Sequence, residues 1–107
     1  MNKAGLAVTM TEAQLEEAVE GMARILGWDV RHIRDSRRQN AEGLPDAFLI
    51  RPPVSFWMEF KTEKGTLTAT QKYLIPRMQA AGQTVYIIRP GDWLSGRVEA
   101  MLGVREF

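Results

Sequence analysis

Residues 46–61, DAFLIRPPVSFWMEFK, decide how this chain folds. The two runs 47–51 and 56–61 are rich in the large apolar residues that favour β-strands. Pro52 and Pro53 lie between them, and proline continues neither strand because its nitrogen carries no hydrogen. We therefore expect the two strands to fold back on each other as an antiparallel hairpin.

This hairpin would bring ionisable side chains together in an apolar strand. Glu59 and Lys61 point to the same face because side chains alternate along a strand. Asp46 and Glu59 are equally far from the proline turn, so they oppose each other with Cβ atoms roughly 4.5–5.5 Å apart. Two carboxylates this close raise each other's pKa unless a cation lies between them. Mg²⁺ favours such oxygen ligands, so the spacing predicts a divalent metal site.

Simpler roles exist for the same residues. Asp46 follows Pro45, and aspartate is common in turns. Glu59 and Lys61 would also suit an ordinary ion pair on a solvent-facing edge strand. Trp57 lies on their face of the strand, which argues against exposure. The metal-site hypothesis therefore depends on the three residues together.

Length and composition narrow the class of protein. A chain of 107 residues forms one domain with a single core. Hydrophobic residues make up 45% and charged residues 25%, as in ordinary globular proteins. Without cysteine there is neither a disulfide framework nor a thiolate metal site, which favours an intracellular, cytoplasmic protein. No apolar stretch approaches the length needed to cross a bilayer, and no signal-peptide pattern opens the chain.

The remaining patterns predict an α/β domain of the order αβββαβα with a mixed sheet. Residues 1–10 have no clear pattern and are interpreted as a loose arm. Thr11 and Gln14 form a capping box for a helix that ends at Gly27, and Trp28–Ile33 alternates as a strand. Residues 34–45 form a polar loop. The later elements are a second capped helix, 69–81, bent at Pro76, a strand over 84–88, and a last helix from Asp92 to Leu102.

Basic residues are concentrated although the net charge is only +1. A basic stripe beside an acidic pocket suits a phosphodiester substrate with its metal. The simpler interpretation of the arginine-rich run from Arg31 to Arg38 is a solvated loop. The candidate DNA-binding residues are Arg31, Arg34, Arg37, Arg38, Lys64 and Lys72.

The first helix carries further acids. Glu12 lies in the first turn, where it complements the helix dipole, and Glu16 follows one turn later. Glu16, Glu17 and Glu20 are expected to form a solvated face. His32 is interpreted as a strand residue and not as a metal ligand.

In order and spacing, Gly43-Leu44-Pro45-Asp46, Glu59-Phe60-Lys61 and Gln71 resemble the PD-(D/E)xK nuclease superfamily, and within it the VRR-NUC (virus-type replication–repair nuclease) family. The likeness extends from about Thr11 to Pro90 and includes the opening helix. It implies a restriction-endonuclease-like fold, a mixed sheet flanked by helices.

The resemblance also implies residue roles. Asp46 and Glu59 would bind Mg²⁺ or Mn²⁺, together with the backbone carbonyl of Phe60. Lys61 would orient or activate the attacking water, or stabilise charge on the phosphate. Glu12 matches the helix glutamate of the family, with Glu16 as the alternative, and Gln71 matches a glutamine near the scissile phosphate.

The substrate implied is branched DNA, cut by a dimer as in Holliday-junction resolvases of phages and prophages, with a role in DNA repair. Weak sequence support for a homodimer comes from the apolar Trp57, Trp93 and Phe107. The alternatives are a monomeric flap or nicking nuclease, and a non-catalytic DNA-binding module whose carboxylates bind metal structurally.

Overall fold

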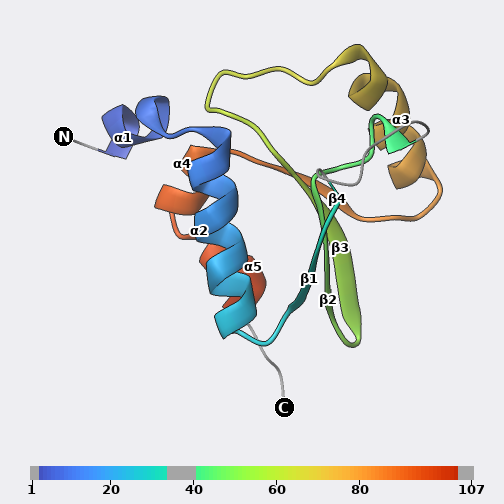
Figure 1. Ribbon diagram of the computed structural model, residues 1–107, viewed down its shortest axis with the longest axis horizontal. Coiled ribbons are helices and arrows are strands. Elements are labelled where there is room, and N and C mark those ends of the chain that lie inside the picture. Colours follow the sequence, from blue (N-terminus) through green and yellow to red (C-terminus); the bar gives the residue numbers. More distant parts are fainter. Residues whose placement is uncertain (1–2, 34–40, 104–107) are drawn as a thin grey trace.

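The computed structural model describes residues 3–33 and 41–103. It has an α/β architecture in which helices flank a four-stranded mixed sheet (Figure 1). The elements in chain order are α1 (Lys3–Thr9), α2 (Glu12–Ile25), β1 (Asp29–His32), β2 (Ala47–Arg51), β3 (Val54–Phe60), α3 (Ala69–Ala80), β4 (Val85–Ile88), α4 (Pro90–Leu94) and α5 (Arg97–Gly103). No helix in these two ranges is long and apolar enough to cross a membrane.

The sheet has the strand order β1-β2-β3-β4. β1 with β2 and β2 with β3 are antiparallel, whereas β4 joins β3 in parallel. Within the hairpin, Ala47 pairs with Met58 and Arg51 with Val54. The predicted fold-back about Pro52-Pro53 is therefore confirmed with the expected register, and the second strand begins earlier than expected, at Val54.

The main core fills the space between the sheet and the helices α2 and α5. Apolar side chains of β2 and β3 that point to this side meet Leu15 and Val19 of α2 and Val98 and Leu102 of α5. The strand residues concerned are Ala47, Leu49, Phe56, Met58 and Phe60, all buried. Because side chains alternate, Asp46 and Glu59 belong to the opposite face of the sheet.

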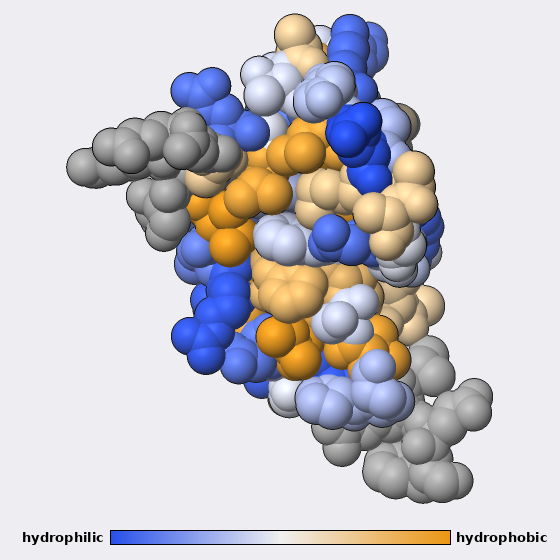
Figure 2. All heavy atoms as spheres, turned by 90° about the vertical axis from the view of Figure 1, so that its right-hand side faces the viewer, coloured by the Kyte–Doolittle hydropathy of each residue, from blue (hydrophilic) through white to orange (hydrophobic). Residues whose placement is uncertain are grey.

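That opposite face is covered in part by α3, which contributes Ile75 and Met78 to a second apolar cluster with Val85. Half-buried residues surround this cluster, among them Trp57, whose ring lies 4.6 Å from that of Phe48. Viewed from this side, the surface shows apolar side chains in its centre with hydrophilic ones along its edges (Figure 2).

Both long helices start as their capping boxes predict. The Thr11 hydroxyl accepts a hydrogen bond from the Gln14 amide, and the Gln14 side chain accepts one from the Thr11 amide. Thr68 and Gln71 repeat this arrangement at α3. The chain remains helical through Pro76.

Three expectations about the ends of the chain were wrong or incomplete. Residues 3–9 form the helix α1 instead of a loose arm, and Ala7 is buried. The expected last helix is two helices, because Gly96 has a φ of +85° that interrupts the helical backbone. Asp92 does not precede a helix; it lies within α4, and its carboxylate accepts a hydrogen bond from the Arg89 amide.

Candidate functional site

Asp46 is held in place by the turn that precedes it. Gly43 adopts a φ of +86°, and a Cβ atom there would lie 2.8 Å from the Thr70 Cγ2 atom of α3. Glycine therefore lets the turn approach the start of α3 closely. Asp46 itself is 1% exposed, and its Oδ2 accepts a hydrogen bond of 2.8 Å from the amide of Phe60. The side chain of Asp46 thus reaches across to the end of β3.

Glu59 and its neighbours complete the buried polar group, which we call the acidic pair site: Asp46, Glu59, Lys61 and Gln71. Glu59 is 1% exposed, and its Oε2 accepts a 2.8 Å hydrogen bond from Nε2 of Gln71. The Lys61 ammonium is 3.4 Å from the same oxygen, and Lys61 is 7% exposed. The sequence prediction that Glu59 and Lys61 share a face is confirmed. The surface ion pair considered for them is excluded by their burial.

Burial and charge repulsion act together on Glu59. Desolvation, followed by the nearby Asp46 carboxylate, raises the pKa of Glu59 from 4.5 to about 7. Lys61 and the hydrogen bond from Gln71 oppose this rise without cancelling it. The ionised form of the carboxylate is therefore poorly compensated by the protein alone.

One oxygen of the pair lacks a partner. Glu59 Oε1 is buried and has no hydrogen-bond partner among the described residues. A buried carboxylate oxygen without a donor is costly, and a bound cation would remove that cost. Two hard carboxylate donors, Asp46 and Glu59, suit Mg²⁺ or Mn²⁺. The residues present therefore fit a divalent metal ion.

Two of the helix glutamates, Glu16 and Glu20, do not lie as the sequence suggested. Glu12 is half-buried, and its predicted place at the metal site remains a prediction. Glu16 and Glu20 were expected on a solvated face, but both are buried and contact His32. Only Glu17 of that group is exposed. In the described ranges, the one group of three or more potential metal ligands comprises Glu16, Glu20 and His32, whose ligand atoms lie within 4.8 Å of one another.

Sequence reasoning missed this second group, although a signal was present. The glutamates at 16 and 20 are one helical turn apart, on the face that carries the buried Leu15, Val19 and Ala23. His32 shares its strand face with Val30, which packs against the same core. Because the buried face of the helix and the core-facing side of the strand pack against each other, these two patterns together would have predicted the contact of Glu16 and Glu20 with His32.

The candidate DNA-binding residues are only partly described. Arg31 is exposed, and its Nε is 3.0 Å from Asp29. Lys64, in the segment that joins β3 to α3, and Lys72, in the first turn of α3, are both exposed. Arg34, Arg37 and Arg38 lie outside the described residues. Trp57 and Trp93, the tryptophans proposed for a dimer interface, are both half-buried. Phe107, the third residue proposed there, lies outside the described residues.

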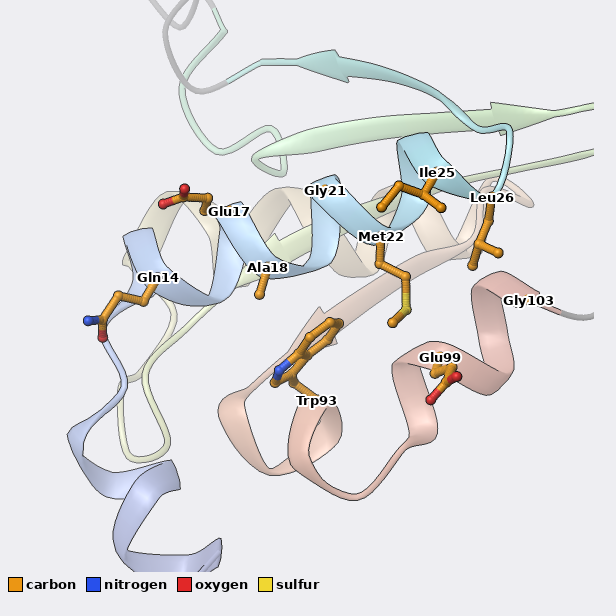
Figure 3. A pocket seen from close by; sticks show the side chains of 10 residues that line it. All are labelled: Gln14, Glu17, Ala18, Gly21, Met22, Ile25, Leu26, Trp93, Glu99 and Gly103. Carbon is orange, nitrogen blue, oxygen red and sulfur yellow. The ribbon is translucent and has the colours of Figure 1, made fainter.

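A groove lies elsewhere on the molecule. It measures about 910 Å³ and runs between α2 and the C-terminal helices, lined by Ala18, Met22, Leu26 and Trp93 among others (Figure 3). Its ionisable residues are Glu17 and Glu99, on opposite walls. The groove is mainly apolar and holds no residue of the acidic pair site. The acidic pair site therefore lies outside this groove.

Comparison of the chain with models of protein families, with curated proteins and with solved structures found no match.

Proposed function

We propose that this chain is a metal-dependent nuclease with the restriction-endonuclease-like fold, of the VRR-NUC type within the PD-(D/E)xK superfamily. The observation that carries the proposal is the buried Glu59 Oε1, which has no hydrogen-bond partner in residues 3–33 and 41–103 and belongs to a side chain close to the Asp46 carboxylate. Two carboxylates and a lysine buried together destabilise the fold unless they bind something. The mixed sheet and flanking helices are compatible with this fold.

Each residue of the acidic pair site has a chemical task in phosphodiester hydrolysis. Asp46 and Glu59 would hold Mg²⁺ or Mn²⁺, an ion that supplies charge neutralisation at phosphate and a more acidic bound water. The amide of Phe60 orients Asp46, and Gln71 orients Glu59 through its side-chain amide. The proposal also includes the backbone carbonyl of Phe60 and the carboxylate of Glu12 as ligands of the ion.

Lys61 would act on the reacting groups. Its ammonium is 3.4 Å from Glu59 Oε2, so it stays on the sheet face that carries the two carboxylates. There it can donate a hydrogen bond to the attacking water or to a non-bridging phosphate oxygen. Attack on phosphorus breaks the bond to the leaving sugar oxygen, which then takes up a proton.

We propose branched DNA as the substrate and a homodimer as the active form. The domain offers little surface for reading base sequence, whereas exposed Arg31, Lys64 and Lys72 can contact phosphates. Symmetric cleavage of a four-way junction needs two active sites. The apolar surface on the α3 side of the molecule is compatible with a second subunit (Figure 2).

The test is a cleavage assay with four-way junctions, flaps and linear duplex of equal length, in Mg²⁺ and in EDTA. We expect metal-dependent cleavage of junctions, abolished by Asp46→Asn, Glu59→Gln or Lys61→Met. Glu99→Gln, which changes an exposed acid of α5, is the matched control and should cleave as the wild type does.

Each outcome separates the alternatives. Cleavage of flaps alone by a monomer would replace the resolvase with a flap nuclease. Binding of DNA without cleavage in any metal would indicate a binding module. Full activity of Glu59→Gln would refute the assignment of the acidic pair site.

A further inference from the structure

The contact between α2 and β1 contains a second polar group, which we call the α2–β1 triad: Glu16, Glu20 and His32. Nε2 of His32 is 2.8 Å from Glu20 Oε1, and its Nδ1 is 3.3 Å from Glu16 Oε1. His32 shares a sheet face with Val30 and the main core, whereas Glu59 points to the α3 face. The triad is therefore distinct from the acidic pair site.

The charges of the triad are incompletely compensated. Glu20 is 2% exposed, and its Oε2 is buried without a hydrogen-bond partner among the described residues. Arg24 approaches only the other oxygen, Oε1, at 3.4 Å, and its side chain is half exposed. A buried carboxylate oxygen without a donor is costly, and a cation bound by this group of potential ligands would remove that cost.

The imidazole adds a second argument. Both of its ring nitrogens face carboxylate oxygens, but a neutral imidazole has only one N–H to donate. In the neutral form one of these two contacts therefore lacks a hydrogen, and a metal ion between the two atoms would satisfy it. A tetrahedral ion bound to Nε2 and Glu20 Oε1 at about 2.0–2.2 Å would hold the two atoms roughly 3.4 Å apart, so the 2.8 Å contact has to open slightly to admit it.

We propose that Glu16, Glu20 and His32 form a site for a divalent transition-metal ion such as Zn²⁺, which joins α2 to β1. One imidazole and two carboxylates are a ligand set that suits zinc better than Mg²⁺, because Mg²⁺ prefers oxygen ligands only. Three protein ligands leave a coordination position for water, and His32, with 43% of its side chain exposed, lies on the open side.

The experiment measures zinc binding in a protein that lacks the acidic pair site. In an untagged Asp46→Asn/Glu59→Gln background, calorimetric titration with Zn²⁺ and metal analysis after dialysis should find one ion per chain. Adding His32→Gln or Glu20→Gln should weaken binding at least about 100-fold, since loss of an outer-sphere partner alone costs 10–100-fold. Adding Glu17→Gln, an exposed acid on the same helix, should change nothing.

X-ray absorption spectroscopy of the zinc-loaded background protein does not depend on the folding of those variants. His32 is the only histidine in the chain, so imidazole scattering from the bound ion must come from it. A stoichiometry near zero, a shell of oxygen ligands only, or unchanged affinity in a folded His32→Gln variant would overturn the proposal. None of these results depends on nuclease activity, so the two proposals fail separately.

Discussion

Replacing Glu59 by glutamine is expected to stabilise the metal-free protein at alkaline pH. Glutamine resembles the protonated carboxyl group in shape and charge, so the substitution removes the ionised form without opening a cavity. The neutral side chain keeps an oxygen for the hydrogen bond that Gln71 donates. The variant loses the repulsion from Asp46 and the cost of burying a charge, which together outweigh the attraction to Lys61 that it also loses.

The magnitude follows from the pKa of Glu59, which burial and Asp46 raise from 4.5 to about 7. Each unit of pKa corresponds to about 1.4 kcal/mol, so the ionised carboxylate costs the fold roughly 3 kcal/mol. The folded pKa is raised, so the folded state keeps a proton that the unfolded chain has released. Stability from Glu59 is therefore present below about pH 4.5 and is lost as the pH rises through about 7.

The assay is urea unfolding of both proteins in EDTA, followed by tryptophan fluorescence between about pH 5 and pH 8.5. The free energy of unfolding of Glu59→Gln should exceed that of the wild type by less than about 1 kcal/mol near pH 5, and by roughly 3 kcal/mol above pH 8. Burial also raises the pKa of Glu20, but both proteins carry Glu20, so the difference isolates Glu59.

A difference that stays constant with pH, or a variant less stable than the wild type at pH 8, would refute this reasoning. Glu99→Gln, at an exposed position, should show no such growth with pH. Adding Mg²⁺ at pH 8 should stabilise the wild type more than Glu59→Gln, because only the wild type keeps both carboxylates. Equal stabilisation would contradict the metal assignment and leave the argument on burial intact.

Three further predictions concern the scaffold of the site and are measured by urea unfolding. Gly43→Ala should lower the free energy of unfolding by about 1–3 kcal/mol and reduce cleavage, because the φ of Gly43 is +86° and a Cβ atom there would meet Thr70. Unchanged stability would contradict the close approach of Gly43 to Thr70. Thr68→Ala should cost about 1 kcal/mol by removing the cap of α3, which carries Gln71, whereas Thr68→Ser should retain it. Leu49→Ala should cost about 2–5 kcal/mol at a fully buried position, and a loss under 1 kcal/mol would show that the core collapses around it.

Local patterns predicted much of the fold. Two capping boxes placed the starts of α2 and α3, because a cap is formed by residues three apart. The proline turn and the alternation of side chains together predicted the register of β2 with β3, which in turn brings Asp46 to the end of β3. These features could be predicted because the residues that form them are close in sequence or are joined by one short turn.

Other features depend on contacts between distant segments. The helix α1 has a weak pattern of its own and buries Ala7 in the folded chain. Glu16 and Glu20 resemble surface acids when only their helix is considered, and become buried because His32 of β1 lies against them. A helix pattern cannot indicate which strand will cover it.

By itself, the sequence determined the α/β class, the hairpin and the pairing of Asp46 with Glu59, since these follow from backbone chemistry and the period of a strand. Only the tertiary structure decided that Glu59 is desolvated, that one of its oxygens has no partner in the described part of the chain, and that Glu20 and His32 meet. The physical reason is that the free energy of a charge depends on the solvent and the groups around it, and both are set by packing between segments far apart in the chain.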